Sequence, residues 1–168
     1  VPSPNGAPFS DARLEGVLQQ TGCTSPEALV RRVVGAVKDY AARADRIRGS
    51  FNRHFFHADK NTYASGSQCA NAMALVVGLV DPQHRDAVLA SLVRDVESRG
   101  YAMTAGDVGF RFLLQALAQS GQSETIYKMI NQDDKPGYGY QLKKGATSLT
   151  EAWDANNSSS HNHFMLGH

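Results

Sequence analysis

A polar stretch near the C-terminal end holds the residues whose types and spacing could do chemistry. Residues 145–154 read Gly-Ala-Thr-Ser-Leu-Thr-Glu-Ala-Trp-Asp, and Ser-His-Asn-His follows at 160–163. Glu151 lies two positions before the single tryptophan, Trp153, and twelve before His163. A glycosidase needs a carboxylate to move a proton, an aromatic surface for the apolar side of a sugar, and neutral polar groups for its hydroxyls. The stretch fits a sugar site, although a capped surface turn has the same residue types.

Four other segments accompany this stretch, at residues 51–53, 65–68, 106–114 and 138–142. Together they resemble the catalytic domain of bacterial and fungal α-L-rhamnosidases, in which a Gly-Ala-Thr-Thr/Ser-x-x-Glu-x-Trp-Asp segment precedes an Asn-His pair. The resemblance covers most of the chain and implies an all-α fold, an (α/α)6 barrel of six helical hairpins. About three hairpins fit in 168 residues, so the resemblance further implies that residues 1–168 are the C-terminal half of such a domain.

The same resemblance implies a reaction. Family members hydrolyse terminal α-L-rhamnosyl bonds with inversion, using two carboxyl groups roughly 6.5–9.5 Å apart. Glu151 matches the general base that activates water, and His163 matches a histidine that can hydrogen-bond a sugar hydroxyl. The general acid belongs to an Asp-Glu-Arg-x-Gly-Trp type of motif, for which this sequence has no counterpart. We therefore expect the chain by itself to turn over little or nothing.

Further residues of the matched segments are candidates for the sugar site. Trp153 could be a sugar platform or a core side chain behind Glu151. Residues 133–140 are expected to form a turn-rich loop. The loop could contain a short strand or act as a lid over the site, and the resemblance places Tyr140 near the mouth of the pocket. Asp107 could face the pocket from an inner helix. Thr150 stands where many family members have tryptophan, so the resemblance does not determine the shape of the pocket wall.

No metal or other cofactor is expected. His161, His163 and His168 could form a metal cluster on paper, but inverting hydrolysis of this kind needs no metal. Cys23 and Cys69 are 46 positions apart without a CxxC spacing, so they predict neither a disulfide framework nor a zinc site.

Helices must position these residues, and their signals begin in the first third of the chain. Residues 1–8 are expected to be loop, with a short helix capped by Ser10 over 11–20. Ser25 and Pro26 predict the start of a second helix, with Ser25 as N-cap. Apolar residues then recur at steps of three and four and predict one buried stripe on a helix of more than 20 residues. The stripe comprises Leu29, Val33, Val37, Tyr40, Ala44, Ile47, Phe51 and Phe55.

The rest of the chain alternates between two kinds of helix. Residues 69–80 are small and apolar all round, which predicts a helix buried on every side, and 83–99 carry one apolar stripe, which predicts an outer helix. The alternation returns with 107–119 and 124–131. A repeat of roughly 40 residues indicates an inner and an outer ring of helical hairpins. Periodicity alone does not distinguish a closed barrel from an open solenoid.

Two other functions compete with a rhamnosidase. The chain could be a non-catalytic helical-repeat interaction domain, or a six-hairpin glycosidase for another sugar. In a glycosidase, Glu151, His163 and Tyr140 should converge on one concave pocket. In a scaffold they should scatter.

Composition limits the partners. Seventeen basic and sixteen acidic side chains give a formal net charge of +1, which provides no electrostatic case for nucleic acid or an anionic membrane. The longest apolar run, 73–80, is far shorter than the roughly 20 residues of a membrane span, so we expect a soluble protein. The N-terminal residues show no targeting signal and suggest the interior of a longer chain. The expected partners are a rhamnose-containing glycoside or oligosaccharide and the other half of the domain.

Overall fold

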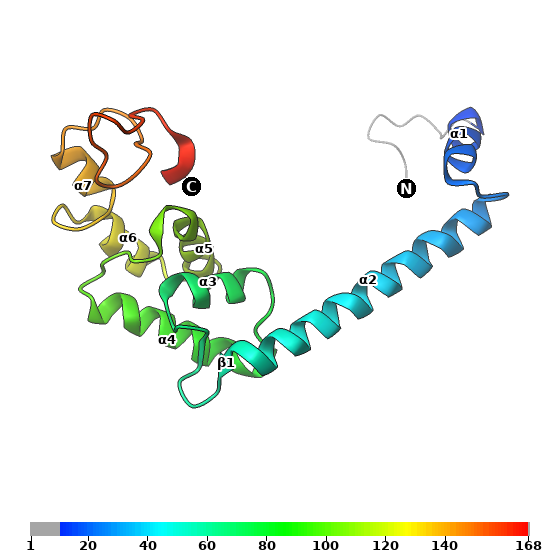
Figure 1. Cartoon of the computed structure of the whole chain (residues 1–168), viewed down its shortest axis with the longest axis horizontal. Helices are drawn as coiled ribbons and strands as arrows, with labels where there is room; N and C mark the ends of the chain where they lie inside the picture. The colour runs from blue at the N-terminus through cyan, green and yellow to red at the C-terminus, as the bar shows by residue number, and fades with distance from the viewer. Residues whose placement is uncertain (1–10, 168) are drawn as a thin grey trace. The chain divides into compact units, whose positions relative to one another are not determined.

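The computed structural model describes residues 11–167, and it is predominantly helical (Figure 1). The chain divides into two compact units, and the boundary along the sequence lies between Gly49 and Ser50. The helices are α1 (Asp11–Thr21), α2 (Pro26–Phe55), α3 (Gln68–Val76), α4 (Arg85–Ser98), α5 (Gly106–Gln119), α6 (Ser123–Asn131) and α7 (Tyr138–Lys143), with short 3-10 turns η1 (Pro82–His84) and η2 (Phe164–Leu166). The strands β1 (Phe56–His57) and β2 (Thr62–Tyr63) form a small antiparallel hairpin. The helical prediction is confirmed, and none of the described helices is long and apolar enough to cross a membrane.

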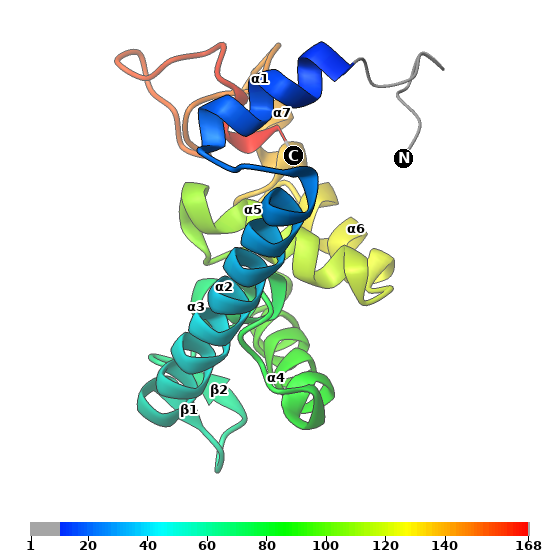
Figure 2. The ribbon, with the colours of Figure 1, turned by 90° about the vertical axis from the view of Figure 1, so that its right-hand side faces the viewer.

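The second unit contains the core, in which α3 packs on both α4 and α5, and α5 packs on α6. The outer helix α4 buries one stripe, because Val88, Leu92 and Val96 are each 0% exposed. The inner helix α5 buries Leu113 and Leu117 as completely. Within this unit the β1–β2 hairpin and the C-terminal loop lie at opposite ends (Figures 1 and 2). The predicted alternation of inner and outer helices is therefore confirmed for α3 to α6.

The inner helices are not covered on every side, contrary to the prediction for residues 69–80. Met73 and Val77 are 39% and 55% exposed, and Val108 on α5 is 69% exposed. Composition predicts that a helix is apolar all round, but burial also requires a neighbour on each side. No described element covers this side of α3.

Helix α2 begins as predicted, since the Ser25 hydroxyl accepts a hydrogen bond from the Ala28 backbone at 3.2 Å and Pro26 occupies the first helical position. The predicted burial of its apolar stripe is wrong for most of the helix, because no residue of α2 is fully buried and only Phe51 of the stripe is partly buried against the core. Tyr40 and Ile47 are 69% and 64% exposed. The amphipathic pattern specifies which face of a helix is apolar, whereas burial depends on a partner.

Residues 138–143 form helix α7, so the expected turn-rich loop is limited to residues 133–137 and the expected short strand is wrong at 138–140. Two glycines allow α7 to lie close to the end of α6. A Cβ atom on Gly139 would lie 2.6 Å from the carbonyl oxygen of Gln132, and one on Gly137 would lie 2.8 Å from that of Met129. These glycines therefore provide close backbone contact, and Tyr140 is presented from a helix.

Two of the segments that resemble the family form buried polar networks. The Tyr63 hydroxyl donates to Asn52 Oδ1 at 2.6 Å, and Asn71 Oδ1 accepts from the Tyr63 backbone at 2.8 Å. Burial, and then the nearby Asp81 carboxylate, raise the pKa of Tyr63 to about 12. Gln68 is 0% exposed and accepts from the Thr104 backbone at 2.8 Å. These networks fix the ends of α2, α3 and α5 relative to one another within the second unit.

Candidate active site

The stretch that contains Glu151 is a loop whose two arms pair through the backbone. The Glu151 amide donates to the Ser160 carbonyl oxygen at 2.9 Å, and the His163 amide donates to the Leu149 carbonyl oxygen at 2.9 Å. The Ser148 hydroxyl also donates to the His161 carbonyl oxygen. This pairing brings Glu151 and His163, twelve positions apart in sequence, onto adjacent arms of one loop.

The Glu151 side chain is exposed and is oriented by its own loop. Its Oε2 atom accepts a hydrogen bond from the Ser160 backbone at 2.9 Å, and no ion pair involves it among the described residues. One carboxylate oxygen is thus held by the backbone while the other remains available to accept a proton. This arrangement suits a general base, which must be both oriented and accessible to water.

A buried polar pair anchors the loop to α7. Gln141 Nε2 donates to the Thr150 hydroxyl at 2.7 Å, and that hydroxyl donates to the Ala152 carbonyl oxygen at 2.7 Å. Gln141 and Thr150 are only 5% and 4% exposed. Sequence reasoning noted Thr150 only as a departure from the family and missed Gln141, because no spacing or motif links them. The pair fixes the backbone on both sides of Glu151.

Trp153 lies in the core behind the loop. It is 7% exposed, and its ring lies edge-on to Phe110 at 5.0 Å and tilted against Tyr138 at 5.7 Å. Its indole N–H is the buried side-chain polar group that lacks a hydrogen-bond partner among the described residues. These contacts fit the interpretation of Trp153 as a core side chain that supports Glu151 from behind.

The other candidate residues come from three elements. His163 is half-buried on the loop, and its ring stacks on Phe164 at 5.4 Å. Tyr140 is half-buried on α7, with the Lys144 ammonium 5.4 Å from its ring centroid. Asp107 lies in the first turn of α5, one turn before the phenylalanine that contacts Trp153. The core under the loop thus connects all three elements.

Two cavities adjoin the loop. One of about 100 Å³ is lined in part by Lys144, Thr150, Trp153 and His161, and one of about 330 Å³ lies between α7 and residues 146–149. Neither is lined by Glu151, His163 or Tyr140, so the expected convergence of these three side chains on one hollow is not seen in either cavity. No group of three or more potential metal ligands occurs among the described residues.

Comparison with known proteins places this loop in a family. Residues 27–168 match the family described as the bacterial alpha-L-rhamnosidase 6 hairpin glycosidase domain. The chain belongs to this family. The match includes the Glu151 loop together with every helix from α3 to α7. The resemblance found in the sequence motifs is therefore confirmed.

Relatives and solved structures that carry the name alpha-L-rhamnosidase are similar to most of this chain. An alpha-L-rhamnosidase of Streptomyces avermitilis is 28% identical over 134 residues, which are 78% of this chain and 13% of the relative. One of Formosa agariphila is 22% identical over 116 residues, 69% of this chain and 12% of the relative. The structure of alpha-L-rhamnosidase from Dictyoglumus thermophilum has a TM-score of 0.69 at 34% identity, covering 77% of this chain and 15% of that one. The structure of the alpha-L-rhamnosidase from Aspergillus terreus has a TM-score of 0.72 at 22% identity, and the match covers 84% of this chain and 18% of that one.

The chain therefore spans about an eighth of the length of these curated relatives. It contributes the helical pairs α3–α4 and α5–α6, together with α2, to a fold named for six hairpins. It is a partial six-hairpin glycosidase domain.

Proposed function

We propose that Glu151 is the general base of a six-hairpin glycosidase that hydrolyses terminal α-L-rhamnosyl bonds with inversion. The observation that carries the proposal is an exposed carboxylate on a loop that backbone hydrogen bonds hold in place, inside the segment that matches the glycosidase family. Relatives that are named alpha-L-rhamnosidase support the choice of rhamnosides as substrates.

In the proposed reaction, a water molecule attacks the anomeric carbon from the side opposite the leaving group. A Glu151 carboxylate oxygen takes a proton from this water, while the Ser160 amide keeps the other oxygen in place. A carboxylic acid across the sugar, roughly 6.5–9.5 Å from Glu151, protonates the leaving oxygen. The β-anomer of rhamnose is then the first product.

Four further residues have proposed roles in substrate binding. His163 lies on the arm that pairs with the Glu151 arm, and it would hydrogen-bond a hydroxyl of the rhamnose. Tyr140 and Asp107 would contribute to the pocket from α7 and α5. Trp153 would act on the substrate indirectly, because it is buried and supports the loop.

The proposal requires a second carboxyl group from outside this chain. The sequence has no counterpart of the acidic Asp-Glu-Arg-x-Gly-Trp type of motif. General acid and general base catalysis each contribute about 10²- to 10⁴-fold, so a chain with only one of them should be nearly inactive. We propose that the remaining hairpins of the domain complete the site and supply the acid.

A graft tests this function in a complete domain. Residues 27–168 replace the matched segment of the Dictyoglumus thermophilum enzyme, and hydrolysis of p-nitrophenyl α-L-rhamnoside is followed. Glu151→Gln should lower kcat by about 10²- to 10⁴-fold with little change in KM. The matched control is Glu124→Gln on the surface of α6, where the side chain is 75% exposed, and it should leave kcat unchanged.

Two outcomes would contradict the proposal. One is a Glu151→Gln graft as active as the unsubstituted graft, or an isolated chain that hydrolyses the substrate regardless of this substitution. The other concerns stereochemistry. Proton NMR of the first-formed sugar should show the β-anomer, and initial release of the α-anomer would mean retention and a different role for Glu151.

A further inference from the structure

The aromatic residues assigned to the sugar site so far are largely covered. Trp153 is 7% exposed and lies in the core behind the loop. Tyr140 is half-buried, with the Lys144 ammonium over its ring. A sugar can pack its apolar side on an aromatic ring only where the ring is accessible. The contribution of this chain to such a contact therefore has to come from another ring.

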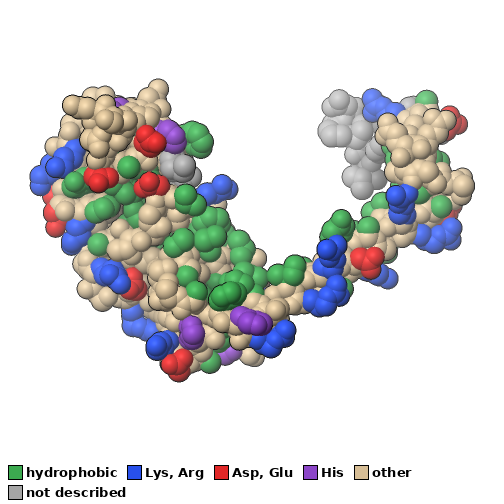
Figure 3. Space-filling view, viewed as in Figure 1, with side chains coloured by type: hydrophobic (Ala, Val, Ile, Leu, Met, Phe, Trp, Pro, Cys, Tyr) green, Lys and Arg blue, Asp and Glu red, His purple; other side chains and the backbone are tan. Residues whose placement is uncertain are grey.

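Phe164 is an aromatic residue beside the same loop that is open to solvent. It follows His163 directly and is 77% exposed. Its ring lies parallel to that of His163, with the ring centroids 5.4 Å apart and the planes at 6° to each other. Figure 3 shows histidine and hydrophobic side chains exposed at the C-terminal loop. The imidazole thus supports the phenylalanine ring on one side, and most of that ring remains accessible.

The exposure of Phe164 does not result from weak packing of its turn. Phe164 begins η2, and Leu166 in the same turn is 0% exposed. The Leu166 carbonyl oxygen accepts a hydrogen bond from the Tyr138 hydroxyl at 2.5 Å. A Cβ atom on Gly167 would lie 2.6 Å from Leu149 Cδ1, so the end of the turn packs closely on the loop. A ring presented by such an anchored turn loses little conformational freedom when it binds a ligand.

The backbone pairing of the loop places Phe164 on the side of the proposed base. The His163 amide donates to the Leu149 carbonyl oxygen at 2.9 Å, and Glu151 follows two positions after Leu149. Phe164 is therefore adjacent to the residue that pairs with the Glu151 arm. A sugar whose hydroxyl bonds to His163, as proposed above, would also reach the ring that stacks on His163.

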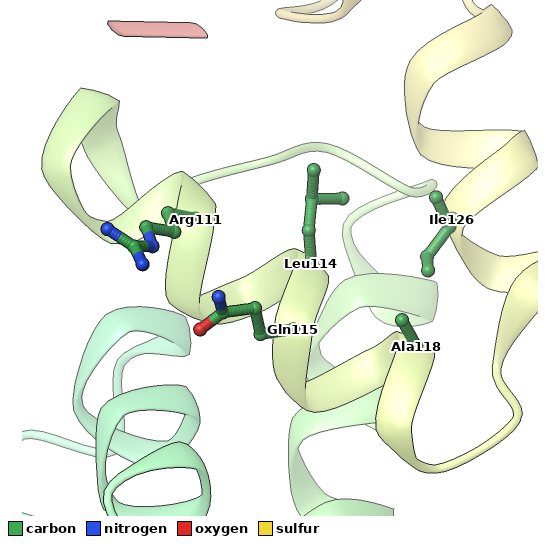
Figure 4. A pocket seen from close by; sticks show the side chains of 5 residues that line it. All are labelled: Arg111, Leu114, Gln115, Ala118 and Ile126. Atoms are coloured by element: carbon green, nitrogen blue, oxygen red, sulfur yellow. The ribbon is translucent and has the colours of Figure 1, made fainter. Parts of the chain in front are cut away.

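A larger cavity lies between α5 and α6, with a volume of about 510 Å³. Figure 4 shows its lining, which consists of Arg111, Leu114, Gln115, Ala118 and Ile126. None of these side chains is aromatic, and none belongs to the loop that carries Glu151. This cavity therefore provides no flat apolar surface for a sugar beside the proposed base.

We infer that Phe164 is a specificity-determining residue that packs against the C6 methyl group of a terminal 6-deoxy sugar. The inference rests on the proposed function and adds the contact that distinguishes rhamnose from sugars without this methyl group. L-Lyxose has the same ring hydroxyls as L-rhamnose and lacks C6. Contact with the aromatic ring removes the methyl group from water, and one missing carbon in an apolar contact lowers kcat/KM by about 10- to 200-fold.

The graft of residues 27–168 into the Dictyoglumus thermophilum enzyme tests this contact. The kcat/KM values are measured for p-nitrophenyl α-L-rhamnoside and p-nitrophenyl α-L-lyxoside. Phe164→Ala should lower the rhamnoside-to-lyxoside ratio by roughly tenfold, through a higher KM for the rhamnoside with kcat little changed. Phe164→Tyr keeps the aromatic ring and should retain the ratio. The matched control Tyr127→Ala removes a 58% exposed ring on α6 and should also leave the ratio unchanged.

Three outcomes would overturn the inference. One is a ratio that Phe164→Ala leaves unchanged, and a kcat that Glu151→Gln still lowers would then leave the proposed function intact. Another is an equal loss of kcat/KM for both substrates, which would mean that Phe164 supports the fold. The third concerns stability: Phe164→Ala should lower the unfolding midpoint of the graft by about 1 °C or less, and a fall of about 5 °C or more would mean that another part of the domain covers the ring. A folded graft that hydrolyses neither substrate would refute both the inference and the proposed function.

Discussion

The hydroxyl of Thr150 should determine the stability of the loop that carries Glu151. It accepts from Gln141 Nε2 and donates to the Ala152 carbonyl oxygen, both at 2.7 Å. Thr150→Val keeps the volume and shape of the side chain while it removes both hydrogen bonds. Thr150→Ser keeps the hydroxyl and removes one methyl group. Comparing the two substitutions separates the hydrogen bonds from packing.

The expected magnitude follows from what the valine leaves behind. The Gln141 amide is 5% exposed and would lose its acceptor, and a buried polar group without a partner costs about 1–3 kcal/mol. The Ala152 carbonyl loses its donor at lower cost, because this residue is only half-buried and solvent can reach it. We therefore expect Thr150→Val to lower the free energy of unfolding by about 2–4 kcal/mol. Thr150→Ser should lower it by about 1 kcal/mol, the value of one buried methyl group.

The single tryptophan provides the assay. Trp153 is buried three positions from Thr150 and reports on the loop and the core beneath it. Urea unfolding followed by its fluorescence should show a midpoint that is roughly 1–2 M lower for Thr150→Val than for the unsubstituted chain, at an m-value of about 2 kcal/mol/M. A valine variant that is as stable as the serine variant would show that the polar pair does not anchor the loop.

Three further substitutions test the core. Tyr63→Phe should lower the free energy of unfolding by about 1 kcal/mol at pH 7 by removing one buried hydrogen bond. Because the folded-state pKa of Tyr63 is raised to about 12, the contribution of Tyr63 to stability is present below pH 10 and is lost as pH rises toward 12. A difference in free energy of unfolding between the two proteins that does not shrink over this pH range would contradict the raised pKa. Gly139→Ala should lower the free energy of unfolding by about 1–3 kcal/mol, because the new Cβ atom would lie 2.6 Å from the Gln132 carbonyl oxygen. A variant with a higher melting temperature by circular dichroism would refute this crowding. Leu92→Ala should lower the free energy of unfolding by about 2–5 kcal/mol, because Leu92 is 0% exposed. If urea unfolding shows that this free energy falls by less than about 1 kcal/mol, α4 does not pack as described.

Local signals predicted several elements correctly. Ser25 and Pro26 start α2 because a hydroxyl that accepts an amide hydrogen bond and a residue without an N–H both suit a helix N-terminus. The single stripe that includes Val88 and Leu92 identified α4 as an outer helix. These predictions succeed because capping and amphipathic spacing act between residues within one or two helical turns.

Elements that depend on distant partners were predicted less well. The glycines around Tyr138 indicate a loop in sequence, yet Gly139 permits the close approach of a helix to the Gln132 carbonyl. Gln141 was missed because its role depends on the Thr150 hydroxyl, which only the fold brings within 2.7 Å. No local pattern encodes such a contact.

By itself, the sequence determined the family and the order of the helices, and it proposed Glu151 as the candidate carboxylate, because these follow from motif spacing and from the apolar face of each helix. Only the tertiary structure decided that the Ser160 amide holds that carboxylate, that Trp153 is buried beneath it, and that the apolar faces of α2 and α3 remain uncovered. The physical reason is that a helix specifies its own apolar face through local geometry. Whether the face is buried depends on which other surfaces meet it.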